Sequence, residues 1–157
     1  LVGVMHPATA ADRAPTPGLD RLDELVARAR DAGLPVAVRV DGNPERLTAG
    51  IDLAAFRVIQ EALTNTIKHA GAAQADVTIR YEPEAVELEV ADDGHGAGME
   101  LPGGHGLVGM RERVSLYGGV LQAGRRRGGG FAVHARLPTR APVPGAALSS
   151  TIPTVPA

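Results

Sequence analysis

Residues 56–70 read FRVIQEALTNTIKHA, and the fold assignment rests on this stretch. Extended back to Ile51 and placed on a helix at about 100° per residue, it separates into two faces. We expect the apolar face to pack against a sheet, as the buried side of an amphipathic helix does. That face holds Ala55, Ile59, Ala62, Leu63, Ile67 and Ala70, and the opposite face holds Arg57, Glu61, Asn65 and Lys68.

The polar face of this helix carries a carboxylate, an amide and an ammonium group close together. Glu61 and Asn65 are four residues apart and therefore adjacent on the helix surface, and Lys68 follows one turn later. Charged residues on an exposed helix face are common, so a solvated surface is the competing interpretation. Asn65 argues against it, because asparagine is a poor helix former whose amide competes for backbone hydrogen bonds. Lys68 is also the single lysine among 16 basic residues, which reflects either chance or a point charge suited to phosphate.

Residues 85–96 read AVELEVADDGHG, an alternating strand that ends in an acidic, glycine-lined turn. An Asp-Gly pair after a strand is often only a tight turn. The functional interpretation is that the carboxylate of Asp92 accepts a hydrogen bond from an exocyclic amine. Gly94 and Gly96 would then let a flat ring approach the backbone, because glycine has no Cβ.

Residues 103–107 read GGHGL and precede an expected helix over residues 107–117, which two glycines terminate. Glycines before a helix leave its first N–H groups free to bind an anion. The loop is weak evidence alone, since the chain holds 20 glycines. It is not a P-loop, which requires Gly-Lys-Ser/Thr, and no βαβ unit surrounds it as a dinucleotide fingerprint requires. Together, the three motifs predict a pocket for a nucleoside triphosphate and its metal.

In this order the motifs resemble the N, G1 and G2 boxes of the gyrase, heat-shock chaperone, histidine kinase and MutL (GHKL) ATPase superfamily. Residues 60–65 (QEALTN), 68–70 (KHA) and 104–114 (GHGLVGMRERV) are similar to the catalytic ATP-binding (HATPase) domains of bacterial two-component sensor histidine kinases. Residues 97–103 are too few for the phenylalanine-bearing box of many such kinases, which favours the subgroup with a short ATP lid. The resemblance extends over roughly residues 19–138.

The resemblance implies roles for the polar helix residues. Asn65 would ligate Mg²⁺ beside the triphosphate of ATP. Glu61 would act as the catalytic base or as the acceptor that orients the attacking group, and Lys68 and His69 would lie near the phosphates. Phosphoryl transfer depends chiefly on positioning, a metal and charge stabilisation, and Mg²⁺ prefers oxygen ligands while it retains several waters.

The resemblance also implies how the base and the phosphates are bound. Asp92 would accept a hydrogen bond from the N6 amine of adenine, with Gly94 and Gly96 against the ring. Backbone N–H groups of the lid would bind the phosphates, and these belong to Gly104, Gly106 and Leu107.

A histidine kinase also needs a phosphoacceptor histidine, and none of the five histidines of this chain has a suitable setting. His6 precedes a proline, which disfavours a helix there, and the others lie in the ATP-binding region: His69, His95, His105 and His134. We therefore expect the γ-phosphoryl group to pass to a histidine on a separate dimerisation domain and then to a response regulator. The whole kinase would be a cytoplasmic or membrane-anchored homodimer, and this domain alone a monomer.

Two other functions stay open on the sequence. One is an anti-sigma-factor-like serine kinase or a stand-alone ATPase of the same fold, although the short lid argues against both. The other is a degenerate module that senses nucleotide or docks a partner. The intact acidic and amide residues argue against degeneration: Glu61, Asn65 and Asp92.

Composition limits the other classes of function. At 157 residues the chain has the length of one ordinary domain, and 44% of its residues are hydrophobic. A net charge of −2 gives no basis for nucleic-acid binding, and the one basic run, Arg125–Arg127, is expected at a solvated hairpin tip. The lack of cysteine excludes disulfides and thiolate metal sites. No run of ~18 apolar residues predicts a membrane span.

Helices that alternate with hairpins predict a two-layer α/β (α+β) sandwich, in which helices cover one face of a mixed, mostly antiparallel sheet. The expected helices span 19–32, 51–70 and 107–117, and the expected strands span 36–40, 76–81, 85–91, 119–123 and 131–137. Residues 1–18 are expected to be the remnant of an upstream helix plus a linker, and residues 19–138 the ATP-binding domain. Residues 139–157, rich in proline, alanine and threonine, are expected to be disordered.

Overall fold

The computed structural model describes residues 16–44, 47–71, 73–95 and 105–140. Gly96 and Gly104, which we expected to bind nucleotide, lie outside these ranges. So do most of the two terminal segments expected to be linker and tail.

Five strands of the described chain form one sheet in the order β1-β2-β3-β5-β4. β1 pairs in parallel with β2, and every other pair of neighbours is antiparallel. The prediction of a mixed, mostly antiparallel sheet is therefore confirmed. The strands are β1 (Val36–Asp41), β2 (Ala75–Tyr81), β3 (Ala85–Asp92), β4 (Val120–Arg125) and β5 (Phe131–Pro138).

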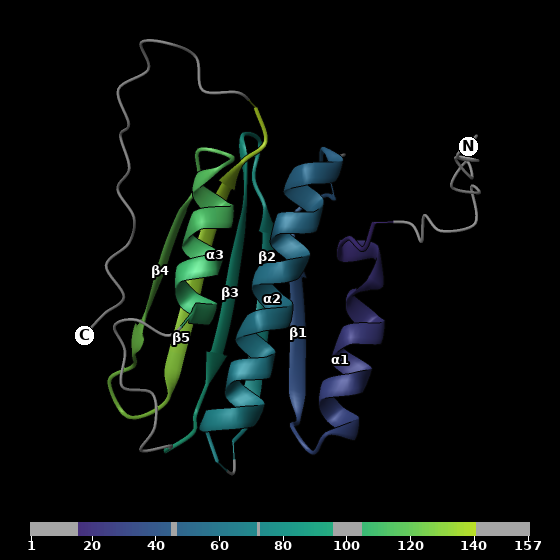
Figure 1. Cartoon of the computed structure of the whole chain (residues 1–157). Helices are drawn as coiled ribbons and strands as arrows, with labels where there is room; N and C mark the ends of the chain where they lie inside the picture. Colours follow the sequence, from purple (N-terminus) through teal and green to yellow (C-terminus); the bar gives the residue numbers. More distant parts are fainter. Residues whose placement is uncertain (1–15, 45–46, 72, 96–104, 141–157) are drawn as a thin grey trace, which may run out of the picture.

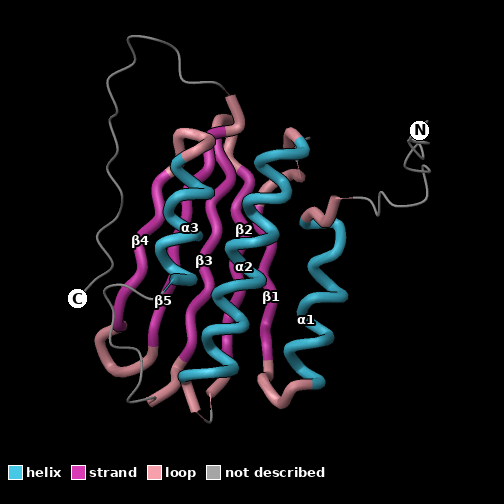
Figure 2. The backbone as a smooth tube through the Cα atoms, in the orientation of Figure 1, coloured by secondary structure: helices cyan, strands magenta, loops and turns pink. Residues whose placement is uncertain are grey.

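The helices lie together on one face of this sheet, which confirms the predicted two-layer sandwich (Figures 1 and 2). α2 crosses the middle of the sheet, with α1 on one side of it and α3 on the other. Within the described ranges, no helix has both the length and the apolar character to cross a membrane. The helical elements are a 3-10 turn, η2 (Leu19–Arg21), then α1 (Leu22–Asp31), α2 (Ala49–His69) and α3 (His105–Ser115).

α2 begins two residues before its predicted start, and its last turn packs differently from the prediction. Thr48 caps the helix, because its side-chain oxygen accepts a hydrogen bond from the N–H of Ile51 at 3.4 Å. The expected burial of Ile67 is wrong, because 42% of that residue is exposed. The neighbouring Thr66 is buried instead and contacts Asp92 through its hydroxyl. The last turn of α2 therefore faces the polar end of β3.

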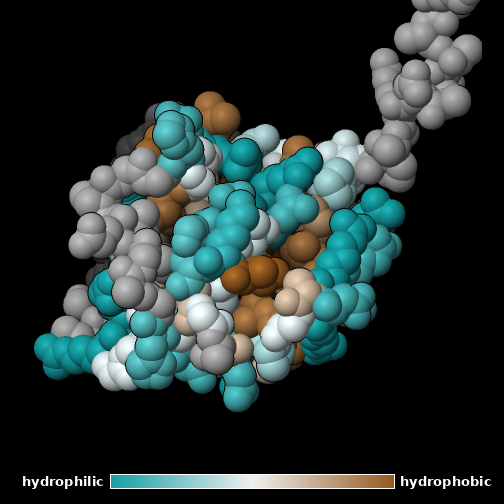
Figure 3. All heavy atoms as spheres, turned by 60° about the horizontal axis from the view of Figure 1, so that its bottom comes forward, coloured by the Kyte–Doolittle hydropathy of each residue, from teal (hydrophilic) through white to brown (hydrophobic). Residues whose placement is uncertain are grey.

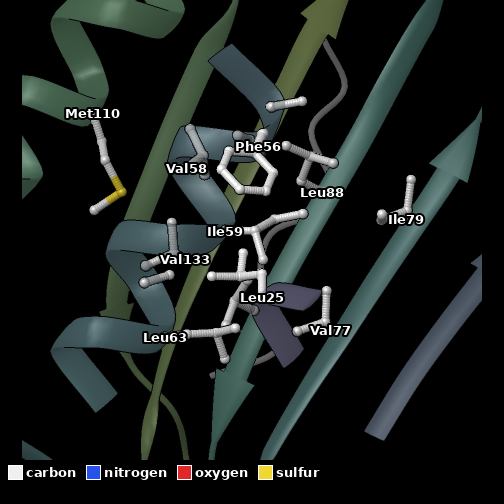
Figure 4. Close-up of a cluster of buried hydrophobic side chains, with 14 of the residues drawn as sticks. Leu25, Phe56, Val58, Ile59, Leu63, Val77, Ile79, Leu88, Met110 and Val133 are labelled. Carbon is white, nitrogen blue, oxygen red and sulfur yellow. The ribbon is translucent and has the colours of Figure 1, made fainter. Parts of the chain in front are cut away.

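The buried face of α2 is also wider than the periodicity predicted. Phe56 and Val58 are buried in addition to the expected aliphatic residues, because α1 and α3 flank the helix. In Figure 4 side chains of α2 meet those of β2 and β3, and Met110 of α3 lies to one side of them. Each fully buried aliphatic side chain of this kind contributes about 1.5–3 kcal/mol to stability.

No helix of the described ranges covers the opposite face of the sheet (Figure 1). One row across the strands alternates in sign: Asp41, Arg80, Glu87 and Arg136. Arg136 approaches Glu87 at 3.3 Å and Arg80 approaches Asp41 at 4.0 Å. This face is therefore polar and largely neutralised by its own residues.

Candidate nucleotide-binding site

Asp92 is the buried acidic residue at the centre of the candidate site. It ends β3, and only 4% of it is exposed. Its Oδ1 accepts hydrogen bonds from the N–H of Gly94 at 2.9 Å and the N–H of Phe131 at 3.3 Å. The hydroxyl of Thr66 lies 3.3 Å from its Oδ2 and 3.1 Å from the carbonyl of Ala62, and its single proton serves one of these acceptors at a time. An ionised carboxylate has about four acceptor positions, so the described residues leave at least one position on Oδ2 for a further donor.

Gly94 lies against the end of α2, where no side chain fits. A Cβ at this position would overlap the backbone carbonyl and the side chain of Ala70. The close approach brings the turn after β3 onto the last turn of the helix. Glycine is required here because it has no Cβ, and the predicted contact of Gly94 with a flat ring stays a prediction.

A small cavity lies between these elements, next to Asp92. Its volume is about 20 Å³, enough for about one water molecule. The cavity is lined by His69, Ala70, Asp92, Gly94, Arg125, Gly130 and Phe131.

The exposed side of α2 carries the expected polar residues. Glu61 and Asn65 are half-buried, whereas Lys68 and His69 are exposed. Thr64, on the same helix, bonds to the carbonyl of Gln60. In contrast, no described residue bonds to the side chain of Glu61 or Asn65, so both remain available to a ligand on the described side of the site.

The start of α3 meets this polar side of α2 at Gly106. A Cβ on Gly106 would overlap Oε1 of Glu61 and would lie 3.5 Å from Nδ2 of Asn65. Leu107, the next residue, is buried in the core and anchors the first turn of the helix. The structure thus brings the first and third motifs together, although their residues are about forty positions apart in the sequence.

The candidate residues fall into two groups that share α2. Asp92 and Gly94 lie with His69 at the cavity, and Glu61 and Asn65 lie with Gly106 farther back along the helix. Asn65 and His69 are four residues apart, which is about 6 Å along a helix axis. In Figure 1 the end of α2, the end of β3 and the β4–β5 hairpin lie at the same end of the molecule.

The side chains available at this end fit a magnesium ion held mainly by phosphate. No group of three or more His, Cys, Asp or Glu residues in the described ranges is arranged to hold a metal. Mg²⁺ at nucleotide sites commonly takes only one or two protein oxygens, together with phosphate oxygens and waters. The amide oxygen of Asn65 and the carboxylate of Glu61 are suitable donors of that kind.

The β4–β5 hairpin is the part of the site that the sequence did not predict. Its basic residues are exposed, as expected. Arg126 nevertheless donates a hydrogen bond from Nη1 to the backbone carbonyl of Asp92 at 3.1 Å, and Arg125 lines the cavity. The sequence signal for this contact was the run of three glycines at residues 128–130, because glycines permit close approach of the backbone. All three have a positive φ in the structure.

Hydrophilic residues surround most of this end of the molecule. Figure 3 turns it toward the viewer and shows a smaller hydrophobic area among hydrophilic residues. Lys68 at the end of α2 is exposed, as are Arg125 and Arg126 in the hairpin. Positively charged side chains therefore belong to both elements that border the Asp92 cavity, α2 and the hairpin, and they suit an anionic ligand.

Comparison with known proteins agrees with this geometry. The family model "Histidine kinase-, DNA gyrase B-, and HSP90-like ATPase" matches residues 50–141, more than half of the chain. The sensor histidine kinase LnrJ of Bacillus subtilis is 32% identical over 108 residues, which cover 69% of this chain and 27% of LnrJ. The sensor histidine kinase NarS of Mycobacterium tuberculosis is 33% identical over 123 residues, which cover 74% of this chain and 28% of NarS. The chain thus spans little more than a quarter of the length of these curated relatives.

Solved structures agree on the fold. The histidine kinase domain of the blue-light activated histidine kinase of Erythrobacter litoralis has a TM-score of 0.64 to this chain at 20% identity. The match covers 82% of this chain and 71% of that domain. The family match, the fold and the buried acid beside the glycine turn lead to one conclusion. The chain belongs to the family of histidine kinase-, DNA gyrase B- and HSP90-like ATPases, and it is an ATP-binding domain of the kind found in sensor histidine kinases.

Proposed function

We propose that this domain binds ATP with Mg²⁺ and delivers the γ-phosphoryl group to a histidine on a separate dimerisation domain of its parent kinase. A response regulator would then receive the phosphoryl group. The observation that carries the proposal is the buried Asp92, which keeps one acceptor position free beside a glycine turn and next to the polar side of α2. The curated relatives, which bear the name sensor histidine kinase, support the class of reaction.

The base of ATP would bind at Asp92. The free position on Oδ2 would accept a hydrogen bond from the N6 amine of adenine, and Gly94 would lie against the ring. Gly96, next along the chain, is proposed to extend the same surface. A carboxylate is an acceptor only, so this contact selects adenine over bases that present a carbonyl at the same place.

The triphosphate would extend along α2 toward the start of α3. Asn65 would hold Mg²⁺, which neutralises charge on the phosphates when bound, and Glu61 would accept the proton of the attacking group or orient that group. Lys68 and His69 would bind phosphate oxygens from the exposed side of α2. Backbone N–H groups of Gly104, Gly106 and Leu107 would bind them from the other side, since the first N–H groups of a helix have no intrahelical partner.

The domain limits and the assembly are part of the proposal. We infer that residues 19–138 form the functional domain and that it is a monomer when isolated. The parent kinase would be a homodimer, because the acceptor histidine lies on a dimerisation domain. We infer a cytoplasmic site of action, because the phosphoryl donor is ATP.

Isothermal titration calorimetry and phosphotransfer together test this function. The domain should bind ATP with Mg²⁺, and Asn65→Ala should remove the dependence on Mg²⁺ while the domain stays folded. Asp76→Asn, on the uncovered face of the sheet, serves as a control for handling of the variants. No heat with ATP and Mg²⁺ at high protein concentration would indicate a docking module in place of an ATP-binding enzyme.

The acceptor distinguishes a histidine kinase from a serine kinase. Labelled ATP is incubated with the domain and either a histidine-bearing helical domain or a serine-bearing partner. An acid-labile phosphate on the helical domain is the expected result, since phosphohistidine hydrolyses in acid. An acid-stable phosphate on the serine-bearing partner would establish the anti-sigma-factor-like alternative.

A further inference from the structure

Next to the hairpin between β4 and β5, the regular backbone pairing of β3 with β5 is interrupted at Asp92. β3 and β5 pair in an antiparallel register that ends with Ala91 opposite Ala132. One step further along the same register, Asp92 lies opposite Phe131. At this step side-chain groups take the place of backbone groups.

The direction of the Phe131 N–H shows which backbone hydrogen bond is missing from the ladder. The N–H of Arg126 donates to the carbonyl of Gly130 at 3.0 Å, so Gly130 directs its carbonyl to the β4 side of the hairpin. Consecutive residues of a paired strand direct their backbone groups to opposite sides, so the N–H of Phe131 faces β3. In a continued ladder it would donate to the carbonyl of Asp92. It donates to the carboxylate oxygen Oδ1 of Asp92 instead.

The carbonyl of Asp92 consequently lacks its ladder donor, and Arg126 supplies another. Nη1 of Arg126 donates to this carbonyl at 3.1 Å. Gly130 makes the approach possible, since a Cβ there would overlap the same carbonyl oxygen. Because Asp92 is buried, a carbonyl left without a donor would be unfavourable.

We propose that Arg126 is a positioning residue for the base-binding carboxylate of Asp92. Because Arg126 donates to the carbonyl of Asp92, the N–H of Phe131 is free to donate to Oδ1 instead. That second hydrogen bond fixes the rotation of the carboxylate. Oδ2 then stays on Thr66 and directs its free acceptor position at the ligand. This inference rests on the proposed function, because it takes Asp92 to bind adenine.

The neighbouring Arg127 provides a matched control. It carries the same charge in the same exposed turn, and no described residue bonds to its side chain. Arg126→Ala and Arg127→Ala therefore remove the same charge, and only the first removes the contact with Asp92. Any long-range effect of the positive charge on an anionic ligand is common to both variants.

The test compares the affinities for ATP and inosine triphosphate, which carries a carbonyl oxygen in place of the N6 amine. The wild-type domain should prefer ATP. In Arg126→Ala the dissociation constant for ATP should rise about tenfold, the effect of one well-placed hydrogen bond, while that for inosine triphosphate stays within about twofold. The preference for ATP should therefore fall in this variant and stay unchanged in Arg127→Ala.

The outcomes separate the positioning role from the function on which it rests. An Arg126→Ala domain that prefers ATP as strongly as wild type would overturn the positioning role alone. A wild-type domain that binds both nucleotides equally would overturn the assignment of Asp92 and the positioning role with it. Should Arg126→Ala not fold, Arg126→Gln keeps the aliphatic stem but ends too early to reach the carbonyl, and the same loss of preference is expected.

Discussion

Replacing Gly106 by alanine separates the stability of α3 from the geometry of the site. Gly106 lies in the first turn of α3, and a Cβ there would come well inside the 3.0 Å that real Cβ atoms keep from other atoms. The atom it meets is Oε1 of Glu61, at the end of a flexible side chain. Ordinary contact begins at 3.4 Å, so this oxygen must retreat by roughly 1 Å, a displacement that can cost about a hundredfold in rate.

The expected effect on stability is small and the effect on transfer is large. A glycine in a helix costs about 0.8–1 kcal/mol relative to alanine, and this gain offsets the rotation of Glu61. We expect Gly106→Ala to unfold within about 1 kcal/mol of wild type, a shift of at most roughly 3–6 °C in Tm. Phosphotransfer to a histidine-bearing domain supplied in trans should fall about tenfold to a hundredfold, because Glu61 is displaced from Asn65.

Gly109 on the same helix is the matched control. A Cβ there would have no atom within 4 Å, so Gly109→Ala should raise stability by about 1 kcal/mol and leave transfer unchanged. Thermal unfolding and single-turnover transfer are measured on both variants. Equal transfer in the two would refute the reasoning, since the contact between Gly106 and Glu61 would then have no part in the reaction.

Three further changes test separate parts of the site and the fold. Asp92→Asn replaces one carboxylate oxygen by an NH2 group, a donor that would face other donors in the site. The affinity for ATP, measured by calorimetry, should therefore fall about tenfold or more, and an unchanged affinity would contradict binding of the base at Asp92. Gly94→Ala adds a Cβ against the backbone of Ala70, which cannot rotate away, and urea unfolding should show a loss of about 1–3 kcal/mol; wild-type stability would show that the turn can move. Burial, and then the charge of Asp52, raises the pKa of the Tyr81 hydroxyl above 10.0. The folded state thus favours the protonated phenol, so Tyr81 contributes to the free energy of unfolding below pH 10 and loses this contribution as the pH rises above 10. If a Tyr81→Phe domain lost as much stability at alkaline pH as wild type, this role of Tyr81 would be excluded.

The sequence predicted the elements of this fold because each has a local pattern. Alternation identified β2 and β3, and helical periodicity identified α2 to within two residues at its start. α3 begins two residues earlier than expected, at His105. Gly106 made this start hard to predict, because glycine is a poor helix former. Its close approach to Glu61 is a tertiary contact, which a local pattern does not show.

What the sequence missed depends on contacts between distant segments. Ile67 belongs to the apolar face by period, but periodicity does not show where the sheet beneath a helix becomes polar. Arg126 contacts a residue 34 positions away, and no local pattern distinguishes it from the neighbouring Arg127. The three motifs predicted which groups the candidate site contains, whereas the contact of the hairpin with one of them, Asp92, was visible only in the structure.

The alternating charges on the uncovered face of the sheet bear on the homodimer that we propose for the parent kinase. Two copies tethered in one dimer would be held at a high effective concentration, at which even a weak contact between them would be largely occupied. A row that reads Asp41, Arg80, Glu87 and Arg136 is already matched within one copy. This row therefore offers no block of like charge to a second copy, and we expect little association of two copies through it.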